Sequence, residues 1–539
     1  MNLNPEYHFS QAPLSVDLPR SKFDRSHGWK GSTVAGNLNC FLCDEILPGD
    51  TVDLRSCLMS RMTTPYYPVM DDCYIDQYFF FVPMRLVWDH TKQFFGENDT
   101  NAWIPETEYI IPQIRIDTNR DTGDFAHQVG LPLSVLPGQK VNALPFRAYR
   151  LIWNEWFRDQ NLQSPKLINK GDTENDTTYM SLLPVNRVHD LFGSCLPGQQ
   201  KGTSPVLNFG AIPVFSQSTR HSVDPVSSTA IKPLTFSASI SGGSPSPVTS
   251  LSYNLGMING QLTPVSGSVT SQNIVISPDN LYAIPQGSGI SVSDLRTAMQ
   301  TQKILEQLAR TGSRYVEYIK GMFGVDSPDA RLQRPELLGH SRHHVNMQEV
   351  TQSSPAMTNS TPLGTVGAYS KSIDNGLAFS KSFTEHGYLI GLFCIRHNRS
   401  YSQGIGKQWT RQTVWDFYNP KLAHISEVPV HTSELFADTS ANDIFGFQEA
   451  WYEYRYKPSI NCGLLDPSVP NTIGDVWTYG DKYDIPPILS DLWLQEGSTE
   501  IARTLAVTDE DQFIHDAYFD YKISRVMPVY SVPGLVDHF

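Results

Sequence analysis

The sequence predicts a mainly β fold whose strands are joined by long loops that carry a few helices. Residues 73–82 and 388–395 form the densest apolar runs, which indicate strands that are covered on both faces. Residues 519–523 alternate between apolar and polar side chains, which indicates a strand with one buried face. The chain also holds 37 Pro and 37 Gly, which favour turns and loops over a helical bundle. An eight-stranded sandwich needs only about 50 residues of strand, so most of the chain is expected to lie in connections.

The segment 45–88 is the stretch around which we expect the core to form. Its LPGD sequence at 47–50 predicts a turn, because Pro presets φ and Gly accepts a positive φ. Residues 52–58 then alternate between apolar and charged side chains, as a half-buried strand does. The aromatic run at 73–82 follows and ends at Pro83, which has no backbone N–H to donate. An aromatic strand buried on both faces belongs in the middle of a β core.

Four segments have helical patterns and are expected to lie in the connections. Residues 146–160 repeat aromatic side chains at three- and four-residue steps, which predicts an amphipathic helix. Residues 291–311 and 315–323 predict two more helices, and residues 84–95 a short one. An aromatic stripe is more often a packing face than a cofactor site, so we expect the helix at 146–160 to belong to the core.

Residues 1–30 are expected to form an N-terminal arm, because the segment is polar and has little apolar surface to pack. Four basic residues lie close together, with Phe23 and Trp29 interspersed among them: Arg20, Lys22, Arg25 and Lys30. Basic residues interleaved with aromatic ones suit contacts with the phosphates and bases of single-stranded nucleic acid. A solvated arm, or one that embraces a neighbouring subunit, is an equally good interpretation.

Residues 204–290 differ in composition from the rest of the chain. Their four formally charged residues are Arg220, Asp224, Lys232 and Asp279, and the remainder is rich in Ser, Thr, Gly, Pro, Val and Ile. Short β-like stretches separated by turn clusters predict an inserted surface protrusion of small strands and loops. Many hydroxyl groups and few charges suit a subunit contact or a glycan contact, and disorder is the alternative.

Composition excludes several functional classes. The net charge of −14 argues against a chain that coats nucleic acid over its whole surface, so any such contact must be local. The seven Cys are scattered and are expected to be reduced thiols of a protein that folds in a cytosol. The N-terminus lacks a secretory pattern, and no apolar stretch approaches the about 20 residues that span a bilayer. We therefore expect a soluble, unexported product.

Candidate metal sites are weak. Cys40 and Cys43 have the C-x-x-C spacing of a zinc site, but Cys57 and Cys73 do not form the second pair that such a site needs. The acidic residues at 172–176 lack the spacing of a calcium-binding EF-hand loop. We predict no metal and no cofactor.

The GHSRHH sequence at 339–344 is expected to be a locally cationic loop that could contact phosphate. It contains Arg342 and lies near Arg331 and Arg334 in the sequence, with no acidic or Cys partner nearby. No nucleophile elbow, zinc-protease, Walker A or dinucleotide-binding motif is present. No catalytic residue is therefore predicted.

Six motifs in one order along most of the chain resemble the major capsid protein of the Microviridae, and specifically its gokushovirus branch. They are PRSKFDRS (19–26), LPGD (47–50), PVMD (68–71), YFFFVPMRLVW (78–88), YRLIWNEWFRDQ (149–160) and GVDSPDARLQRPE (324–336). Residues 340–344 depart from the small polar residues that this family has after the last motif.

The resemblance implies an eight-stranded antiparallel jelly roll of the viral capsid type, with long inter-strand insertions that carry a few helices. Residues 31–203 and 291–539 would form the shell domain, residues 1–30 the arm, and residues 204–290 the protrusion. Pentamers of the chain would build a T=1 icosahedral shell around a circular single-stranded DNA genome. The protrusion would meet a host surface receptor, without membrane insertion.

The resemblance also implies partners and a location. A small basic DNA-binding phage protein and a scaffolding protein would assist assembly in the host bacterial cytoplasm, and the product would be the virion. The candidate nucleic-acid contacts are Arg20, Lys22, Arg25, Lys30, Arg331, Arg334 and Arg342. From a different functional class, the alternative is a carbohydrate-active β protein in which Trp and Tyr stack on sugars beside a pair of carboxylates.

Overall fold

The fold is described here from a computed structural model. It describes residues 19–97, 108–116, 122–134, 138–174, 177–206, 291–354, 362–439, 443–469 and 474–530, with six short strands between 214 and 283. The chain divides into two compact units, residues 202–305 and the remainder. The larger unit is mainly β and antiparallel, as the sequence predicts.

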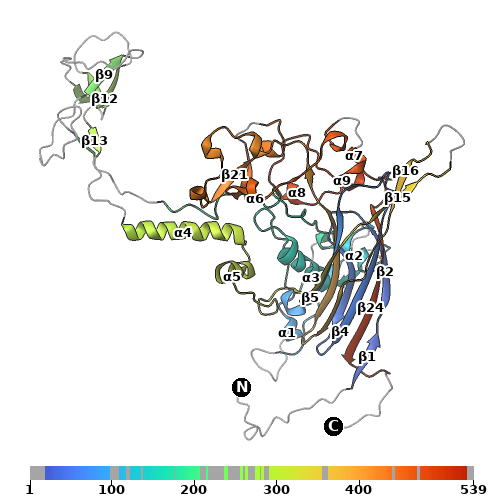
Figure 1. The fold of residues 1–539 in the computed structure, drawn as a ribbon. Helices are drawn as coiled ribbons and strands as arrows, with labels where there is room; N and C mark the ends of the chain where they lie inside the picture. The colour runs from blue at the N-terminus through green and yellow to red at the C-terminus, as the bar shows by residue number, and fades with distance from the viewer. Residues whose placement is uncertain are drawn as a thin grey trace, which may run out of the picture. The chain divides into compact units, whose positions relative to one another are not determined.

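The first sheet of the larger unit has six strands (Figure 1). They are β1 (Arg20–Asp24), β2 (His27–Thr33), β4 (Thr51–Met62), β17 (Ser372–Asp374), β18 (Ala378–Ser382) and β24 (Phe513–Val526). Strands β1 and β2 both pair with β24, β24 pairs with β4, and β17 and β18 both pair with β4, all antiparallel. The sheet is therefore four strands wide at any level.

The second sheet has four antiparallel strands in the order β14, β5, β19, β3. Their bounds are β3 (Asn39–Ile46), β5 (Cys73–Pro83), β14 (Glu336–His344) and β19 (Gly387–His397). Strands β5 and β19 pair over eleven residues at the centre of the sheet. Burial of nearly every residue along both strands confirms the prediction from their apolar runs.

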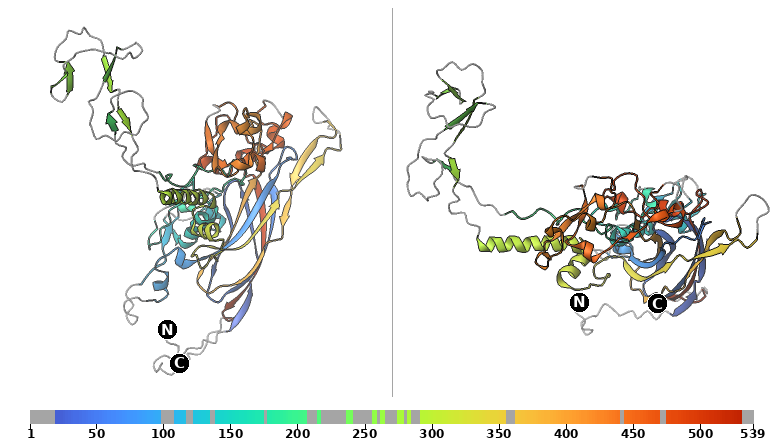
Figure 2. Two further views of the ribbon diagram at one scale, coloured as in Figure 1. Left: turned by 60° about the vertical axis from the view of Figure 1, so that its left-hand side comes forward. Right: turned by 45° about the horizontal axis from the view of Figure 1, so that its top comes forward.

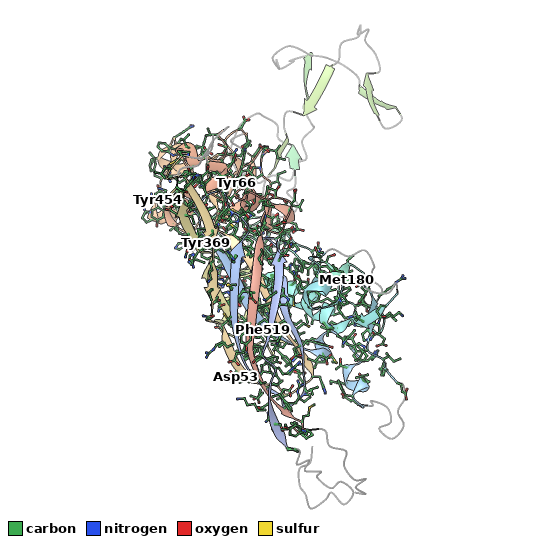
Figure 3. The ribbon with its side chains drawn as sticks, turned by 90° about the vertical axis from the view of Figure 1, so that its right-hand side faces the viewer. Asp53, Tyr66, Met180, Tyr369, Tyr454 and Phe519 are labelled. Atoms are coloured by element: carbon green, nitrogen blue, oxygen red, sulfur yellow. The ribbon has the colours of Figure 1, made fainter. Side chains whose placement is uncertain are left out.

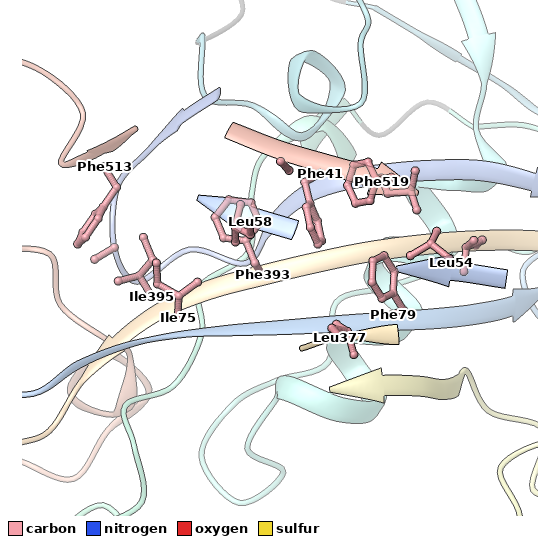
Figure 4. Close-up of a cluster of buried hydrophobic side chains, with 14 of the residues drawn as sticks. Phe41, Leu54, Leu58, Ile75, Phe79, Leu377, Phe393, Ile395, Phe513 and Phe519 are labelled. Atoms are coloured by element: carbon pink, nitrogen blue, oxygen red, sulfur yellow. The ribbon is translucent and has the colours of Figure 1, made fainter. Parts of the chain in front are cut away.

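Apolar side chains from the two sheets meet in one core (Figure 4). The ring of Phe41 on β3 lies 5.2 Å from the ring of Phe519 on β24 and 5.6 Å from that of Phe79 on β5. Leu54 and Leu58, on the predicted buried side of β4, are fully enclosed in the same core. The two sheets therefore form a β sandwich.

The outer face of the second sheet is covered by the connection that follows β5. Phe80 and Ile390 point away from the sandwich core and pack with Tyr149 and Trp153 in a second apolar cluster. The elements in the first part of this connection, up to residue 180, are η2 (Met84–Leu86), α1 (Thr91–Phe94), β6 (Gln113–Arg115), α2 (Phe125–Gln128), β7 (Lys140–Asn142), α3 (Leu144–Ile152), η3 (Trp153–Phe157) and η4 (Thr177–Met180). This cover explains why the central strands are apolar on both faces.

The predicted helices are confirmed with one exception. The aromatic helix runs from α3 into η3, a π-helical stretch, and the two later helices are α4 (Val292–Thr311) and α5 (Tyr315–Phe323). Gly312 and Gly324 follow these two helices with φ of +94° and +68°, values that glycine adopts without strain. The single helix expected at 84–95 is wrong, because non-helical residues 87–90 separate η2 from α1.

The expected arm at 1–30 differs from the structure at its C-terminal end. Residues 20–24 and 27–33 form β1 and β2, and residues 1–18 lie outside the described residues. Phe23 and Trp29 pack against the sandwich core, so the aromatic residues of this segment fold into the sheet. Alternation of burial along β1 gives each basic side chain of that strand an outward position.

A third apolar cluster holds together the connection between β19 and β24. Its elements are β20 (Ser400–Tyr401), η5 (Lys407–Trp409), η6 (Val414–Asp416), η7 (Pro420–Leu422), β21 (Glu427–His431), η8 (Thr432–Glu434), β22 (Ile444–Glu449), α6 (Tyr452–Arg455), β23 (Ser459–Ile460), η9 (Gly463–Leu465), α7 (Gly474–Trp477), α8 (Asp491–Leu494) and α9 (Thr499–Ala502). These elements gather at one end of the sandwich (Figures 1 and 3). The hairpin of β15 (Met347–Thr351) and β16 (Val366–Ser370) extends beyond the sheets at the same end (Figure 2).

The smaller unit contains three described two-stranded pairs and the first part of α4. The strands are β8 (Val214–Ser216), β9 (Phe236–Ile240), β10 (Leu255–Ile258), β11 (Gln261–Pro264), β12 (Ile274–Pro278) and β13 (Leu281–Ala283). They pair as β8 with β13, β9 with β12 and β10 with β11, all antiparallel. The Oγ atom of Ser291 accepts a hydrogen bond from the backbone N–H of Asp294 in the first turn of α4.

Candidate nucleic-acid interface

The four basic residues in and between β1 and β2 differ in how strongly other residues of the protein bind their charged groups. Arg20 donates to the Oγ1 atom of Thr51, 3.0 Å away, and to a backbone carbonyl. Arg25 forms a bidentate ion pair with Asp44. Both guanidinium groups therefore fasten the edge of the sheet to the turn and strand beside it.

Two lysines of the same edge are more available. Lys30 is 80% exposed and only approaches Asp516 on β24, at 3.9 Å. Lys22 is exposed and makes no ion pair with any residue that the structure describes. These two ammonium groups can reach a ligand without breaking a strong contact.

Arg331 and Arg334 precede β14 and have different surroundings. The guanidinium group of Arg334 lies 4.0 Å from the ring centre of Trp156 and 3.5 Å from Asp329, and it is 10% exposed. Burial lowers the pKa of Arg334, although Asp329 opposes that change. Arg331 is exposed and has no ion-pair partner among the residues described. Arg334 therefore has a packing role, whereas Arg331 is open to a ligand.

Arg342 belongs to a buried ionic cluster around Asp76 on β5. Its Nε and Nη2 atoms lie 2.5 and 3.0 Å from the two carboxylate oxygens, and Arg396 on β19 donates its Nε to the same group at 3.0 Å. Burial raises the pKa of Asp76, but hydrogen bonds and charge from both guanidinium groups outweigh it and hold the pKa below its usual value. The carboxylate is fully enclosed, so it needs these cations to remain charged.

The expected cationic loop at 339–344 is wrong in two respects. The segment is part of strand β14, and three of its histidines face carboxylates: His340 lies 3.6 Å from Asp76, His343 3.4 Å from Asp374, and His344 3.9 Å from Asp72. Antiparallel pairing with β5 places Arg342 opposite Asp76. The acidic partners come from strands that are remote in sequence, which is why local composition did not reveal them.

The structure brings together several arginines that no sequence pattern connects. A pocket of about 400 Å³ beside η3 and α5 is lined by Arg158, Arg187, Arg310, Arg314 and Arg396. These residues come from four separate parts of the chain, so no motif or spacing marks them.

Large apolar side chains are exposed on the connection between β19 and β24. Trp409, Val414 and Trp415 are 77%, 84% and 73% exposed. Further exposed members are Ile405, Phe417, Tyr418, Ile425, Tyr454, Tyr456, Ile460 and Leu464. Such a concentration of apolar surface is typical of a protein–protein contact.

The cysteines do not converge. Cys40 packs in the cluster outside the second sheet, whereas Cys73 lies in the core between the sheets. Across the described ranges, no group of His, Cys, Asp and Glu side chains is arranged to hold a metal ion. In the same part of the chain, every helix is too short or too polar to cross a bilayer.

Comparison with known proteins gives consistent matches over nearly the whole sequence. The model of the family described as "Capsid protein (F protein)" matches residues 12–535. Capsid protein VP1 of Chlamydia phage 1 is 35% identical, with 98% of this chain and 97% of the relative covered. Capsid protein VP1 of Bdellovibrio phage phiMH2K is 36% identical and that of Spiroplasma virus 4 is 35% identical, each with 99% of this chain and 98% of the relative covered.

Proposed function

The chain belongs to the capsid protein (F protein) family, and from that premise we propose that its copies build a T=1 icosahedral shell around a circular single-stranded DNA genome. It is a major capsid protein of the gokushovirus type within the Microviridae, and capsid proteins of phages are components of the virion. The relatives are structural proteins and not enzymes, so the carbohydrate-active alternative is withdrawn.

We infer that the sandwich is an eight-stranded jelly roll. We count β1 with β2 as one interrupted strand and β17 with β18 as another. The two sheets then contain eight strands, which follow one another along the chain as β1/β2, β3, β4, β5, β14, β17/β18, β19 and β24. The first sheet then holds the first, eighth, third and sixth of them, and the second sheet holds the second, seventh, fourth and fifth. This order supports the two interlocked Greek keys of a viral jelly roll.

The observation that carries the proposal is the family match from residue 12 to residue 535, which spans the sandwich and both long connections. The exposed apolar surface around Trp409 and Trp415 supports contacts between copies, because closed symmetry repeats one such contact many times. The test is negative-stain microscopy and gel filtration of the full chain expressed with its phage partners. Pentamers or closed shells are expected, and a persistent monomer under all these conditions would contradict the proposal.

Local basic residues would contact the genome, since the chain as a whole carries a net charge of −14. Of the seven predicted contacts, Lys22, Lys30 and Arg331 are the most available, whereas Arg25 and Arg342 are engaged by carboxylates. Changing these three residues together to Gln should lower packaged DNA while pentamers still form. Unchanged DNA content would remove them from the interface.

Because the chain is net acidic, we also propose that a separate small basic phage protein binds the genome. A scaffolding protein would guide assembly in the bacterial cytoplasm.

The inserted segment at 204–290 is proposed as the protrusion that attaches to the host. Its support is the separation of residues 202–305 as a compact unit of their own. Deletion of 204–290 should spare shell assembly and abolish infection, and a loss of folding on deletion would instead make the segment structural.

A further inference from the structure

The arginine-lined pocket is bordered by residues of β5, β19 and η3, by the segment 186–189 and by the turn that joins α4 to α5. Its walls carry five arginines and His189 but only two carboxylates, those of Asp159 and Glu317. Three of the arginines form ion pairs with carboxylates that do not line the pocket. The pairs are Arg396 with Asp76, Arg187 with Asp481, and Arg310 with Glu427. Arg314 also has carboxylate neighbours, Glu317 at 3.1 Å and Glu155 at 3.9 Å, whereas Arg158 makes no ion pair with a described residue.

Arg158 makes no direct ion pair with a described residue, although the charges of Glu155 and Asp159 act on it. Its side chain makes one hydrogen bond, from Nη1 to the carbonyl of Gln163 at 2.8 Å, and no ion pair with any described residue. The carboxylate of Asp159, which follows it in the chain, instead accepts the backbone N–H groups of Asn161 and Leu162. A guanidinium group has five N–H donors, so most of those of Arg158 are unused.

Arg314 is held against Arg158. Its Nη2 atom donates to the backbone carbonyls of Asn154 and Arg158, at 2.8 and 2.9 Å, and its Nη1 atom bonds to Glu317 at 3.1 Å. Burial lowers the pKa of Arg158 and the charge of Arg314 lowers it further, whereas the charges of Glu155 and Asp159 oppose that change. Arg158, which has no direct ion pair, is therefore the guanidinium group that an anion in the pocket would reach.

Unused donors support the same conclusion. The Nε atoms of Arg158, Arg187 and Arg314 are all enclosed and lack a hydrogen-bond acceptor. The Nε atoms of Arg334, Arg399, Arg411 and Arg503, outside the pocket, also lack an acceptor, so the three in the pocket support a ligand only together with its five guanidinium groups.

We propose that this pocket binds a phosphate group, supplied by the phosphodiester backbone of single-stranded DNA. Guanidinium groups bind phosphate through paired N–H donors, and phosphate offers more acceptor oxygens than a carboxylate does. Trp156 and Phe157 line the same walls, and aromatic side chains beside basic ones are typical of single-strand binding. The DNA source of the phosphate rests on the proposed function, whereas the phosphate site itself does not.

The test compares the full-length chain with its Arg158→Gln variant. Arg158 is the best residue to change because its side chain holds only one carbonyl, whereas Arg314 also fastens the start of α5. The matched control is Lys421→Gln, which removes an equal charge from an exposed position outside the pocket. Circular dichroism and a thermal melt confirm that both variants fold as the parent does.

Two probes separate the sources of phosphate. Calorimetric titration with inorganic phosphate measures the site itself, and fluorescence anisotropy of a labelled oligothymidylate measures the DNA backbone. Arg158→Gln should weaken both by about tenfold, the usual effect of losing a charge-assisted hydrogen bond, while Lys421→Gln changes neither by more than about twofold. If Arg158→Gln weakens inorganic phosphate alone, the pocket is a site for free phosphate and the DNA source is wrong.

Equal binding of both probes by Arg158→Gln and the parent would overturn the proposal. A second overturning result is that Arg158→Gln prevents pentamer formation without changing either binding curve, because the occupant would then be a carboxylate of a second copy. Shell formation by the parent chain is measured in a separate experiment. A pocket that does not bind phosphate can therefore be distinguished from a chain that does not form a capsid.

Discussion

The sandwich core and a second buried ionic cluster, formed by Arg399, Asp481 and Glu496, are both enclosed but are held together by opposite kinds of side chain. Between the sheets, Phe41, Phe79 and Phe519 pack ring against ring. In the connection after β19, Arg399 lies with no exposed side-chain surface, 2.8 Å from Asp481 and 3.0 Å from Glu496. The first core needs only apolar side chains at alternate positions, whereas the second needs specific partners.

This difference has consequences for tolerance to change. Apolar packing loses stability in proportion to the atoms removed. A buried ion pair adds little net stability, yet removal of one partner leaves an enclosed charge unsatisfied and is severely destabilising. The four predictions below test the contrast, from the largest expected effect to the smallest.

Arg399→Met should have the largest effect, a loss of about 4 kcal/mol in the free energy of unfolding. The substitution removes the cation that Asp481 and Glu496 share; Asp481 keeps Arg187 at 3.2 Å, whereas Glu496 loses its arginine. Urea denaturation followed by tryptophan fluorescence measures the loss. A change below about 1 kcal/mol would show that water or another cation replaces Arg399.

Leu54→Ala should cost about 3 kcal/mol, because a fully buried leucine of β4 is replaced by a smaller side chain in the sandwich core. The same denaturation experiment measures it, and the solvent-facing Arg55→Ala on the next position is the control. Equal losses for the two variants would contradict the assignment of faces on β4.

Acid should weaken the sandwich through His515 on β24. Its ring nitrogens lie 2.8 Å from the hydroxyls of Thr33 and Ser60, and burial lowers its pKa from 6.5 to about 3. The unfolded chain therefore binds a proton before the folded one does, and stability falls as the pH drops below 6.5. The expected slope approaches about 1.4 kcal/mol per pH unit.

Urea denaturation of the parent and of His515→Gln at pH 7, 6 and 5 tests this expectation. The glutamine side chain cannot take up a proton as the histidine does, so the unfolding free energy of the variant should change less over this range than that of the parent. Parallel pH profiles would mean that the histidine does not carry the dependence.

Lys30→Gln should have the smallest effect, with no measurable change in unfolding free energy. The ion pair of Lys30 with Asp516 is long and lies on an exposed surface, where such pairs contribute little. A clear loss of stability in the same denaturation assay would show that β2 depends on this contact.

The sequence-based predictions succeeded where the determining pattern is local. Alternation at 52–58 and the apolar run at 388–395 identified β4 and β19 with their buried faces, because strand geometry fixes which side chains share a face. The helix at 84–95 was overpredicted, since tertiary packing of Val87 and Trp88 took precedence over a helical pattern.

The candidate site was less predictable than the fold. Arg342 and its partner Asp76 are 266 positions apart, and Arg399 and Glu496 are 97 apart, so only the completed fold brings each pair together. Local composition around residue 340 indicated positive charge correctly but could not show the acidic strand beside it. The arginines of the pocket have no shared motif at all.

The central claim is that this chain functions by closing into a shell through its exposed connection surfaces. An electron cryomicroscopy reconstruction of particles assembled from the full chain tests it most directly. We expect a closed icosahedral particle in which Trp409 and Trp415 are buried between neighbouring copies. Particles in which both side chains face solvent, or the absence of any closed particle, would contradict the claim.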